Sequence, residues 1–177
     1  MLGTYTNKRD LVFVDLETNG LDTDTAILEI AALRYTAGQF TEKASFEYLI
    51  RFDGVINPSA AAVHKIDSES LRMYGRDIKE VLGLFVDFSS EAILIGHNII
   101  NFDLRILNYH LWRHELSLSC IGVLDTKRIA ERLLTLPSYR LEALARHFGV
   151  IEPSYHRAMA DVRATAGVFQ GLLRSDA

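Results

Sequence analysis

The stretch LVFVDLETNG, residues 11–20, determines both the fold and the chemistry expected of this chain. Its first six residues are an apolar run that ends in an acid, which is typical of a buried strand with polar groups at its end. Side chains two residues apart on a strand point the same way, so Asp15 and Glu17 project on one side, about 6–7 Å apart along the strand. Two like charges at such a place raise each other's pKa unless a cation is present. Taken alone, this pair also fits a solvated strand end.

Hydrophobic patterns on either side of this strand predict an α/β fold. Further strands are expected at residues 26–35, 46–51, 92–95 and 121–124, and a Gly-containing turn at 36–39 joins the first two of these. Helices are expected at residues 77–88, 101–112, 126–134, 139–148 and 157–173. Three early strands joined by short turns, followed by strands that alternate with helices, predict a mixed sheet covered by helices. The sequence shows no repeat or Pro/Gly-rich linker, so we expect a single domain over residues 1–177, with its core at about 11–173.

The composition is that of an ordinary globular protein. Of its 177 residues, 49% are apolar, which excludes disorder, and a chain of this size needs no disulfide or structural metal to fold. Cys120 is the one cysteine, which fits a reducing cytosol. No apolar run approaches the roughly 18 residues of a membrane span, and residues 1–10 lack the apolar core of a secretory signal. We therefore expect a cytoplasmic protein that makes no membrane contact.

A second acid follows the short apolar strand at residues 92–95. The segment GHNIINFD, residues 96–103, comes directly after this strand and opens a helix. We expect Asn101 to be the N-cap of that helix, with Asp103 in its first turn. The ordinary interpretation of Asp103 is a favourable contact with the helix dipole. The functional interpretation is that Asp103 points into the same crevice at the strand ends as the first two acids.

A third segment, HRAMAD at residues 156–161, opens the last helix. Asp161 lies on the flank of the apolar stripe of this helix, half buried, where a carboxylate needs a partner. The ordinary interpretations are a salt bridge to an arginine such as Arg157 and a solvated loop histidine at His156. The functional interpretation is that both His156 and Asp161 face one crevice.

Four carboxylates and one histidine from three separated segments are what a pair of hard divalent cations requires, with a base beside them. The net charge is −4, from 23 acids and 19 bases, so the four candidate acids account for the whole excess of negative charge. The two parts of the chain also differ in charge. Residues 1–104 carry 16 acids and 9 bases, whereas residues 105–177 carry 7 acids and 10 bases. Such a distribution could pair a metal site with a track for phosphates.

The three segments resemble, in their order and spacing, the exonuclease motifs of the DEDDh family, the DnaQ-like 3′–5′ exonucleases of the ribonuclease H-like superfamily. The segments that carry the resemblance are DLETNG (15–20), HNIINFD (97–103) and HRAMAD (156–161). The resemblance implies a mixed five-stranded sheet, with three antiparallel strands plus parallel strands, flanked by helices. It also implies a nuclease similar to the epsilon subunit of DNA polymerase III.

The resemblance further implies a role for each motif residue. Asp15, Glu17 and Asp161 would hold one divalent cation, Mg²⁺ or Mn²⁺, and Asp15 would bridge to a second cation with support from Asp103. His156 would deprotonate the attacking water, because a histidine with an ordinary pKa near 6.5 can accept a proton at neutral pH. The expected products are a nucleoside 5′-monophosphate and a strand shorter by one nucleotide.

Several positions match those that bind the terminal nucleotide in the family, namely Thr18, Leu21, His64, Asn98 and Phe102. His64 lies in PSAAAVHKI, residues 58–66, which resembles a loop whose histidine faces the substrate, although Lys65 stands where the family often has Gly. Phe102 fits a core residue equally well, since aromatic residues at a helix start are often buried. The segments that begin at Asp125 and Tyr139 are assigned to packing.

Two functions of different classes fit these residues. The favoured one is a metal-dependent 3′–5′ exonuclease acting on DNA or RNA. The alternative is a non-catalytic module on the same fold that binds nucleic acid or a polymerase, which would not require His156. The expected partners are a nucleic-acid 3′ end and a polymerase or repair protein. The modest basic balance favours single-stranded ends over long duplexes.

Overall fold

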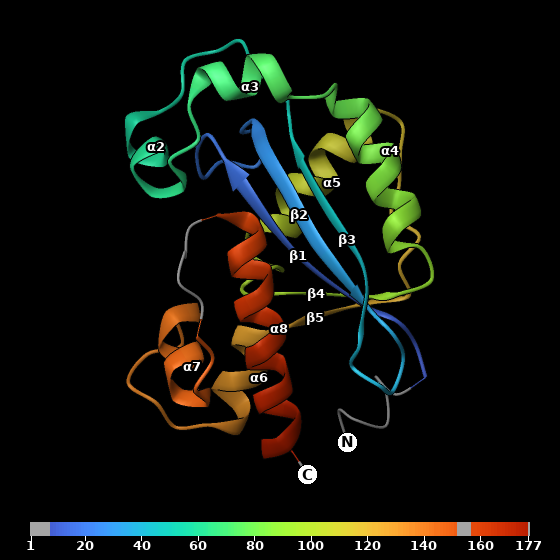
Figure 1. Cartoon of the computed structure of the whole chain (residues 1–177), viewed down its shortest axis with the longest axis vertical. Helices are drawn as coiled ribbons and strands as arrows, with labels where there is room; N and C mark the ends of the chain where they lie inside the picture. The colour runs from blue at the N-terminus through green and yellow to red at the C-terminus, as the bar shows by residue number, and fades with distance from the viewer. Residues whose placement is uncertain (1–7, 152–156, 177) are drawn as a thin grey trace.

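The computed structural model describes residues 8–151 and 157–176. A five-stranded sheet with the order β3-β2-β1-β4-β5 runs through its centre (Figure 1). The strands are β1 (Leu11–Thr18), β2 (Ile27–Tyr35), β3 (Glu42–Leu49), β4 (Ile93–Gly96) and β5 (Gly122–Asp125). The first three strands pair antiparallel, and β4 and β5 are added in parallel. The predicted mixed five-stranded sheet, with three antiparallel strands plus parallel strands, is confirmed.

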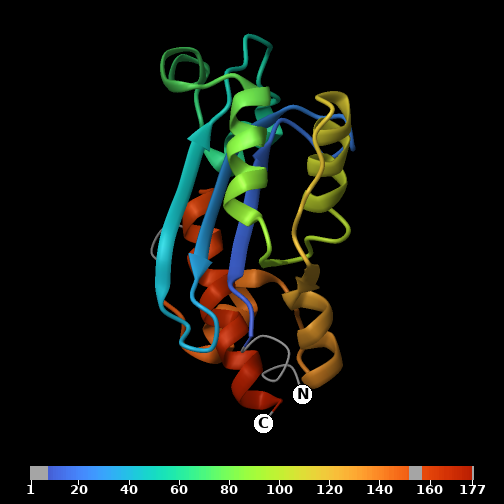
Figure 2. The ribbon, with the colours of Figure 1, turned by 90° about the vertical axis from the view of Figure 1, so that its right-hand side faces the viewer.

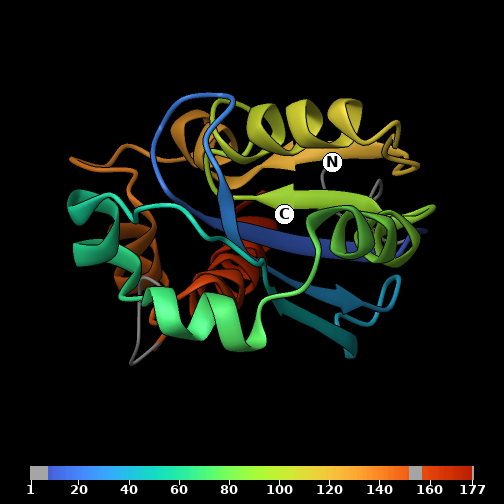
Figure 3. The same ribbon diagram turned by 90° about the horizontal axis from the view of Figure 1, so that it is seen from above.

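Helices cover both faces of this sheet. They are α2 (Pro58–His64), α3 (Ser68–Tyr74), α4 (Ile78–Ser89), α5 (Asp103–Arg113), α6 (Thr126–Leu133), α7 (Leu141–Phe148) and α8 (Ala158–Ser175). The long helix α8 packs on one face, whereas α4 and α5 pack on the other (Figures 1 and 2). The short helices α2 and α3 lie across the end of the sheet at which β1 finishes (Figures 1 and 3). Among the described residues, none of the helices combines the length and the hydrophobicity needed to cross a bilayer.

Both faces of β1 are buried, which explains its nearly continuous apolar sequence. Val12 and Val14 belong to the core beneath α4 and α5, whereas Phe13 belongs to the core beneath α8. Because side chains alternate along a strand, Asp15 and Glu17 share the face of Phe13 and project toward α8. The alternation therefore sets which helix approaches the two acids.

The end of β1 is left open by the neighbouring strand β4. The two strands pair only over Leu11–Phe13 and Ile93–Ile95, and then they separate. In open α/β sheets, ligands bind in the crevice outside the carboxyl ends of strands, where neighbouring connections diverge. The candidate acids lie at this place.

The structure differs from the sequence predictions of local structure in four places. Residues 58–64 form a helix instead of a loop, and α3 was not foreseen, because each is only seven residues long. Strand β3 begins at Glu42, four residues before the predicted start, because its first half is an exposed edge with no apolar alternation. Asn101 is not the N-cap of α5: the helix begins at Asp103 after Phe102, and no side chain caps it.

Candidate metal centre and active site

Three of the predicted acids meet at one point of the structure. Asp15 and Glu17 come from the end of β1, and Asp161 comes from the first turn of α8. Each offers a carboxylate oxygen, and these oxygens all lie within 4.8 Å of one another. Closely spaced carboxylate oxygens are the ligands that hard divalent cations such as Mg²⁺ prefer. The donor set therefore fits the cation that the sequence analysis predicts.

Asp103 approaches the same strand from the opposite face of the sheet. It is buried at the start of α5, and its Oδ1 accepts a hydrogen bond from the backbone N–H of Leu16 at 3.2 Å. This N–H belongs to the part of β1 that has no partner in β4, so Asp103 replaces a ladder hydrogen bond there. The contact holds the fourth acid beside Asp15, whose pKa it helps to raise.

The acids destabilise each other's charged forms. Burial and the charges of Asp103 and Asp161 raise the pKa of Asp15 well above its usual range. Burial and the neighbouring Asp161 raise the pKa of Glu17 to about 8. Burial likewise raises the pKa of Asp103 to about 7. Carboxylates with such pKa values are characteristic of sites that bind cations or carry out catalysis.

The metal-free protein is expected to lose stability as the pH rises. An acid whose pKa is raised by folding contributes stability below its unfolded pKa, and this stability is lost as the pH rises through the folded value. For Glu17 this loss occurs between about pH 4.5, its ordinary pKa, and about pH 8, its pKa in the folded protein. The expected loss is at least about 2 kcal/mol, or roughly 4–8 °C in melting temperature. Thermal melts at both ends of this pH range, with and without Mg²⁺, measure it.

Bound Mg²⁺ should reverse this loss, because the cation favours the charged carboxylates and binds the folded state. The Mg²⁺-induced rise in melting temperature should accordingly be larger at pH 8 than at pH 5. An equal rise at both pH values would contradict the proposed coupling between the carboxylates and the cation.

A fifth carboxylate, Glu29, lies next to these acids but is engaged in another contact. It is only 1% exposed and stands directly opposite Glu17 on β2. Its carboxylate forms an ion pair with the Arg157 guanidinium at 3.0 Å and accepts the backbone N–H of Ala158 at 3.3 Å. This contact fixes the start of α8 against the sheet and thereby places Asp161. Arg157, which the ordinary interpretation of the sequence pairs with Asp161, instead forms its ion pair with Glu29.

Replacing Glu29 with Ala is expected to destabilise the protein by about 1–3 kcal/mol. The substitution leaves the Ala158 N–H without its acceptor and removes the partner of a half-exposed arginine. Glu42→Ala is the matched control, because Glu42 also pairs with an α8 arginine, Arg163, but both side chains are exposed. The control should change stability by less than about 1 kcal/mol. Equal effects of the two variants in urea denaturation would contradict the role given to Glu29.

Asp125 organises the loop between β4 and α5. Its carboxylate accepts the backbone N–H groups of Asn98 at 3.0 Å and Ile100 at 3.3 Å, and it also caps the start of α6. Asn98 has a left-handed backbone, with φ of 60°, which asparagine tolerates better than most residues. The Asn101 side chain donates to the Asn98 side chain and accepts from Arg128 of α6, so it is not available to cap α5.

The other predicted substrate positions come from the end of β1, the connection that follows it and the loop before α5. Thr18 is buried and donates its hydroxyl to the Gly20 carbonyl at 2.7 Å, whereas Leu21 is 82% exposed in the connection to β2. Asn98 and Phe102 lie in the loop before α5, and Phe102 is half buried against the core. Contact between these residues and a nucleotide stays a prediction.

His64 is buried at the C-terminal end of α2. Its Nδ1 accepts the backbone N–H of Ile66 at 2.9 Å, and its Nε2 has no hydrogen-bond partner among the described residues. Burial lowers the pKa of His64, which favours the neutral ring. Lys65, at the position where the related family often has Gly, adopts a left-handed backbone with φ of 57°. Gly adopts this left-handed conformation freely, whereas it costs Lys65 roughly 1–2 kcal/mol.

His156, the predicted base, lies outside the described residues. The described chain resumes at Arg157, which Glu29 holds. Glu29 and Asp125 are the residues that sequence reasoning missed as organisers of the site. For Glu29 the available signal was a lone acid within ILEIAAL, the apolar first seven residues of β2.

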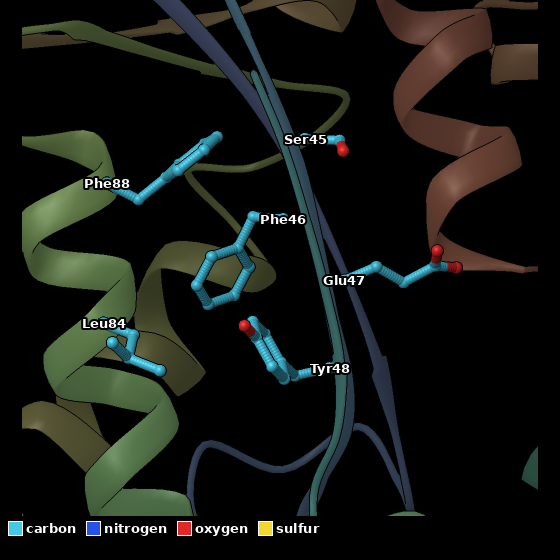
Figure 4. Close-up of a pocket in the computed structure, with 6 residues that line it drawn as sticks. All are labelled: Ser45, Phe46, Glu47, Tyr48, Leu84 and Phe88. Atoms are coloured by element: carbon cyan, nitrogen blue, oxygen red, sulfur yellow. The ribbon is translucent and has the colours of Figure 1, made fainter.

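An open hollow of about 530 Å³ at the edge of the sheet is not the candidate site (Figure 4). Phe46 and Tyr48 of β3 point into it toward α4, and Glu47 points to the opposite side (Figure 4). None of the four candidate metal ligands lines this hollow. The candidate centre is instead identified by its carboxylates.

Comparison with known proteins adds independent information. Residues 12–169 match the RNase_T family model, described as Exonuclease. A PolC-type DNA polymerase III of Thermotoga maritima is 34% identical over 89% of this chain, which spans 11% of that polymerase. The DNA polymerase III subunit epsilon of Aquifex aeolicus is 27% identical over 92% of this chain and 79% of its own. This chain thus corresponds to about a tenth of the length of the PolC-type relatives.

Solved structures show the same fold at lower sequence identity. Exonuclease I of E. coli, crystallised with a dT13 oligonucleotide, superimposes with a TM-score of 0.80 at 21% identity. The superposition covers 94% of this chain and 41% of that enzyme. The likeness supports the ribonuclease H-like architecture described above.

Proposed function

The chain belongs to the RNase_T exonuclease family, and from that premise we propose that it is a metal-dependent 3′–5′ exonuclease that releases nucleoside 5′-monophosphates. The observation that carries the proposal is the group formed by Asp15, Glu17 and Asp161, whose carboxylate oxygens lie within 4.8 Å of one another. Asp103 stands beside them on the other side of β1. The nearby Arg157 forms its ion pair with Glu29, the acid that stands opposite Glu17 on β2.

The residues present fit two divalent cations, Mg²⁺ or Mn²⁺. Asp15, Glu17 and Asp161 would hold one of them, and Asp15 with Asp103 would hold the other. When bound, such a pair lowers the pKa of water and stabilises negative charge on the departing oxygen. The raised pKa values of Glu17 and Asp103 mean that cations and protons compete for these carboxylates. Activity should therefore need a higher cation concentration at lower pH.

His156 is proposed as the general base that takes the proton of the attacking water. It directly precedes Arg157, which Glu29 ties to β2, and lies five residues before Asp161. Its place in HRAMAD, the segment that also supplies Asp161, supports this role. The departing 3′ oxygen would then belong to the shortened strand, and the phosphate would leave with the released nucleotide.

A single-stranded 3′ end is the substrate that we propose, in DNA or RNA. Its support is the modest basic balance of residues 105–177 and the single-stranded dT13 bound by the structurally similar exonuclease I. A polymerase or repair protein is proposed as a partner, because the relatives include polymerase III chains and an epsilon subunit.

The test is hydrolysis of 5′-labelled strands in Mg²⁺ or Mn²⁺. Single-stranded DNA, duplex DNA with recessed or frayed ends, RNA and dinucleotides form the substrate panel. We expect products shortened one nucleotide at a time from the 3′ end, and no products with a chelator. Stabilisation by Mg²⁺ without hydrolysis of any strand would overturn the proposal and favour the non-catalytic binding module.

A further inference from the structure

The outer face of α5 exposes aromatic rings that no part of the site description uses. Trp112 is 73% exposed, which is unusual for a residue whose large apolar surface is normally covered. The Tyr109 ring lies beside it, with ring centroids 6.4 Å apart. The Arg113 guanidinium lies 5.9 Å from the Tyr109 centroid, close enough for a cation–π contact.

These residues form one stripe along the helix. Arg105 and Tyr109 are four positions apart, and Trp112 and Arg113 follow on the next turn of the same side. The opposite side of α5 is buried, with Ile106, Leu107 and Leu111 in the core. We call the set of exposed Arg105, Trp112 and Arg113, together with half-buried Tyr109, the α5 stripe.

The α5 stripe is continuous with the candidate metal centre. Asp103 is the first residue of the same helix, so Trp112 lies about 14 Å farther along its axis. Arg105 donates to the Thr23 hydroxyl at 2.6 Å, in the connection between β1 and β2. That connection also carries the exposed Leu21, a predicted contact of the terminal nucleotide. A strand whose 3′ end is at the acids could thus continue directly onto the stripe.

The charges of the stripe suit phosphates. Arg105 donates to the neutral oxygens of Thr23 and Asn101, and Arg113 donates to the Tyr109 hydroxyl. None of these acceptors is a carboxylate, so these hydrogen bonds do not neutralise the positive charge of either arginine. Aromatic rings that stack on bases, combined with cations that follow the backbone, are how proteins bind single strands without regard to sequence.

Another exposed aromatic provides a comparison. Tyr74 is 70% exposed beside an open groove of about 600 Å³ that also contains Arg76 and Arg157. Each of these arginines is already paired with a glutamate, Glu80 or Glu29. The groove therefore offers a strand less uncompensated positive charge than the α5 stripe does.

We propose that the α5 stripe binds the single-stranded substrate upstream of the bond to be cleaved, with bases stacked on Trp112 and Tyr109 and phosphates held by Arg105 and Arg113. This inference rests on the exonuclease function proposed above. It assigns that enzyme a preference for single-stranded ends several nucleotides long over dinucleotides, and it gives the preference a structural cause.

Trp112→Ala tests the inference by substrate length. The readout is kcat/KM for a strand of about twelve nucleotides divided by kcat/KM for a dinucleotide. We expect this ratio to fall about tenfold, mainly through KM of the longer strand, because one base–aromatic stack is lost. A purely structural defect would lower both rates alike. Tyr74→Ala is the matched control and should leave the ratio unchanged.

A second measurement does not depend on catalysis. Trp112 is the only tryptophan of the chain, so its fluorescence reports contact at the stripe. In an Asp15→Asn background, which prevents degradation, we expect the longer strand to quench this fluorescence more than a dinucleotide does. Adding Arg105→Ala or Arg113→Ala should weaken binding and reduce the slope of log affinity against log salt by about 0.7 per lost phosphate contact.

An unchanged length ratio in Trp112→Ala, or equal quenching by both substrates, would overturn the inference and leave the stripe as a surface for a protein partner. A changed ratio in Tyr74→Ala alone would place the strand in the other groove. The exonuclease proposal is judged separately, by the cleavage of the panel by the unmodified protein. Failure of the α5 stripe proposal therefore does not imply failure of the exonuclease proposal.

Discussion

Asp15→Asn is expected to reduce nucleotide release by at least about 10³-fold while the protein stays folded. Asp15 is the carboxylate proposed to hold both cations, and bound cations stabilise the transition-state charge by several kcal/mol. A loss of about 4 kcal/mol corresponds to this factor. The measurement is single-turnover cleavage of a 5′-labelled single strand at saturating Mg²⁺, with circular dichroism of the variant as the check on its fold.

The same substitution is expected to raise the stability of the metal-free protein at pH 8. Burial and the neighbouring acids Asp103 and Asp161 disfavour the Asp15 carboxylate, and the amide removes that charge. Asp87→Asn, an exposed position on α4, is the control and should leave both activity and stability unchanged. Wild-type cleavage by Asp15→Asn would contradict the mechanism. A large fall in its metal-free stability would contradict the electrostatic account.

His156→Ala is expected to slow cleavage by about 10²–10⁴-fold, the usual contribution of a general base. The proposed base must be neutral to accept a proton, so the wild-type rate at saturating Mg²⁺ should rise with pH as a histidine loses its proton. This rise should disappear in the variant, and added imidazole should restore part of the activity. His147→Ala, an exposed histidine on α7, is the matched control.

An unchanged rate in His156→Ala would remove this residue from the role of base. A reduced rate that keeps the wild-type pH dependence would instead give it a structural role. Mg²⁺ should still raise the melting temperature of the variant, because the proposed cation ligands are all retained. This separates loss of the base from loss of the metal centre.

Hydrophobic periodicity predicted where the strands and the long helices occur along the chain. A buried strand such as β1 has an apolar run that is hard to mistake, and the stripe of α8 covers eighteen residues. The exposed first half of β3 has no such pattern, because an edge strand pairs through its backbone whatever its side chains are. The helices α2 and α3 are too short for the period to be recognised.

The sequence also identified the candidate metal ligands. It did not identify the contacts that hold these ligands in place. Alternation along β1 placed Asp15 and Glu17 on one side, and the family motifs singled out Asp103 and Asp161. The backbone N–H of Leu16 donates to Asp103 because β4 stops pairing with β1 before this residue. No local sequence pattern shows where that pairing ends. The pairing of Glu29 with Arg157 joins residues 128 positions apart in the chain.

The central claim is that these carboxylates together bind a pair of divalent cations. Diffraction from crystals soaked in Mn²⁺, recorded for its anomalous signal, tests it most directly. We expect two peaks about 3.5–4 Å apart, one among Asp15, Glu17 and Asp161 and the other between Asp15 and Asp103. Saturating Mn²⁺ that leaves this position without a peak, or that binds only elsewhere on the molecule, would contradict the account.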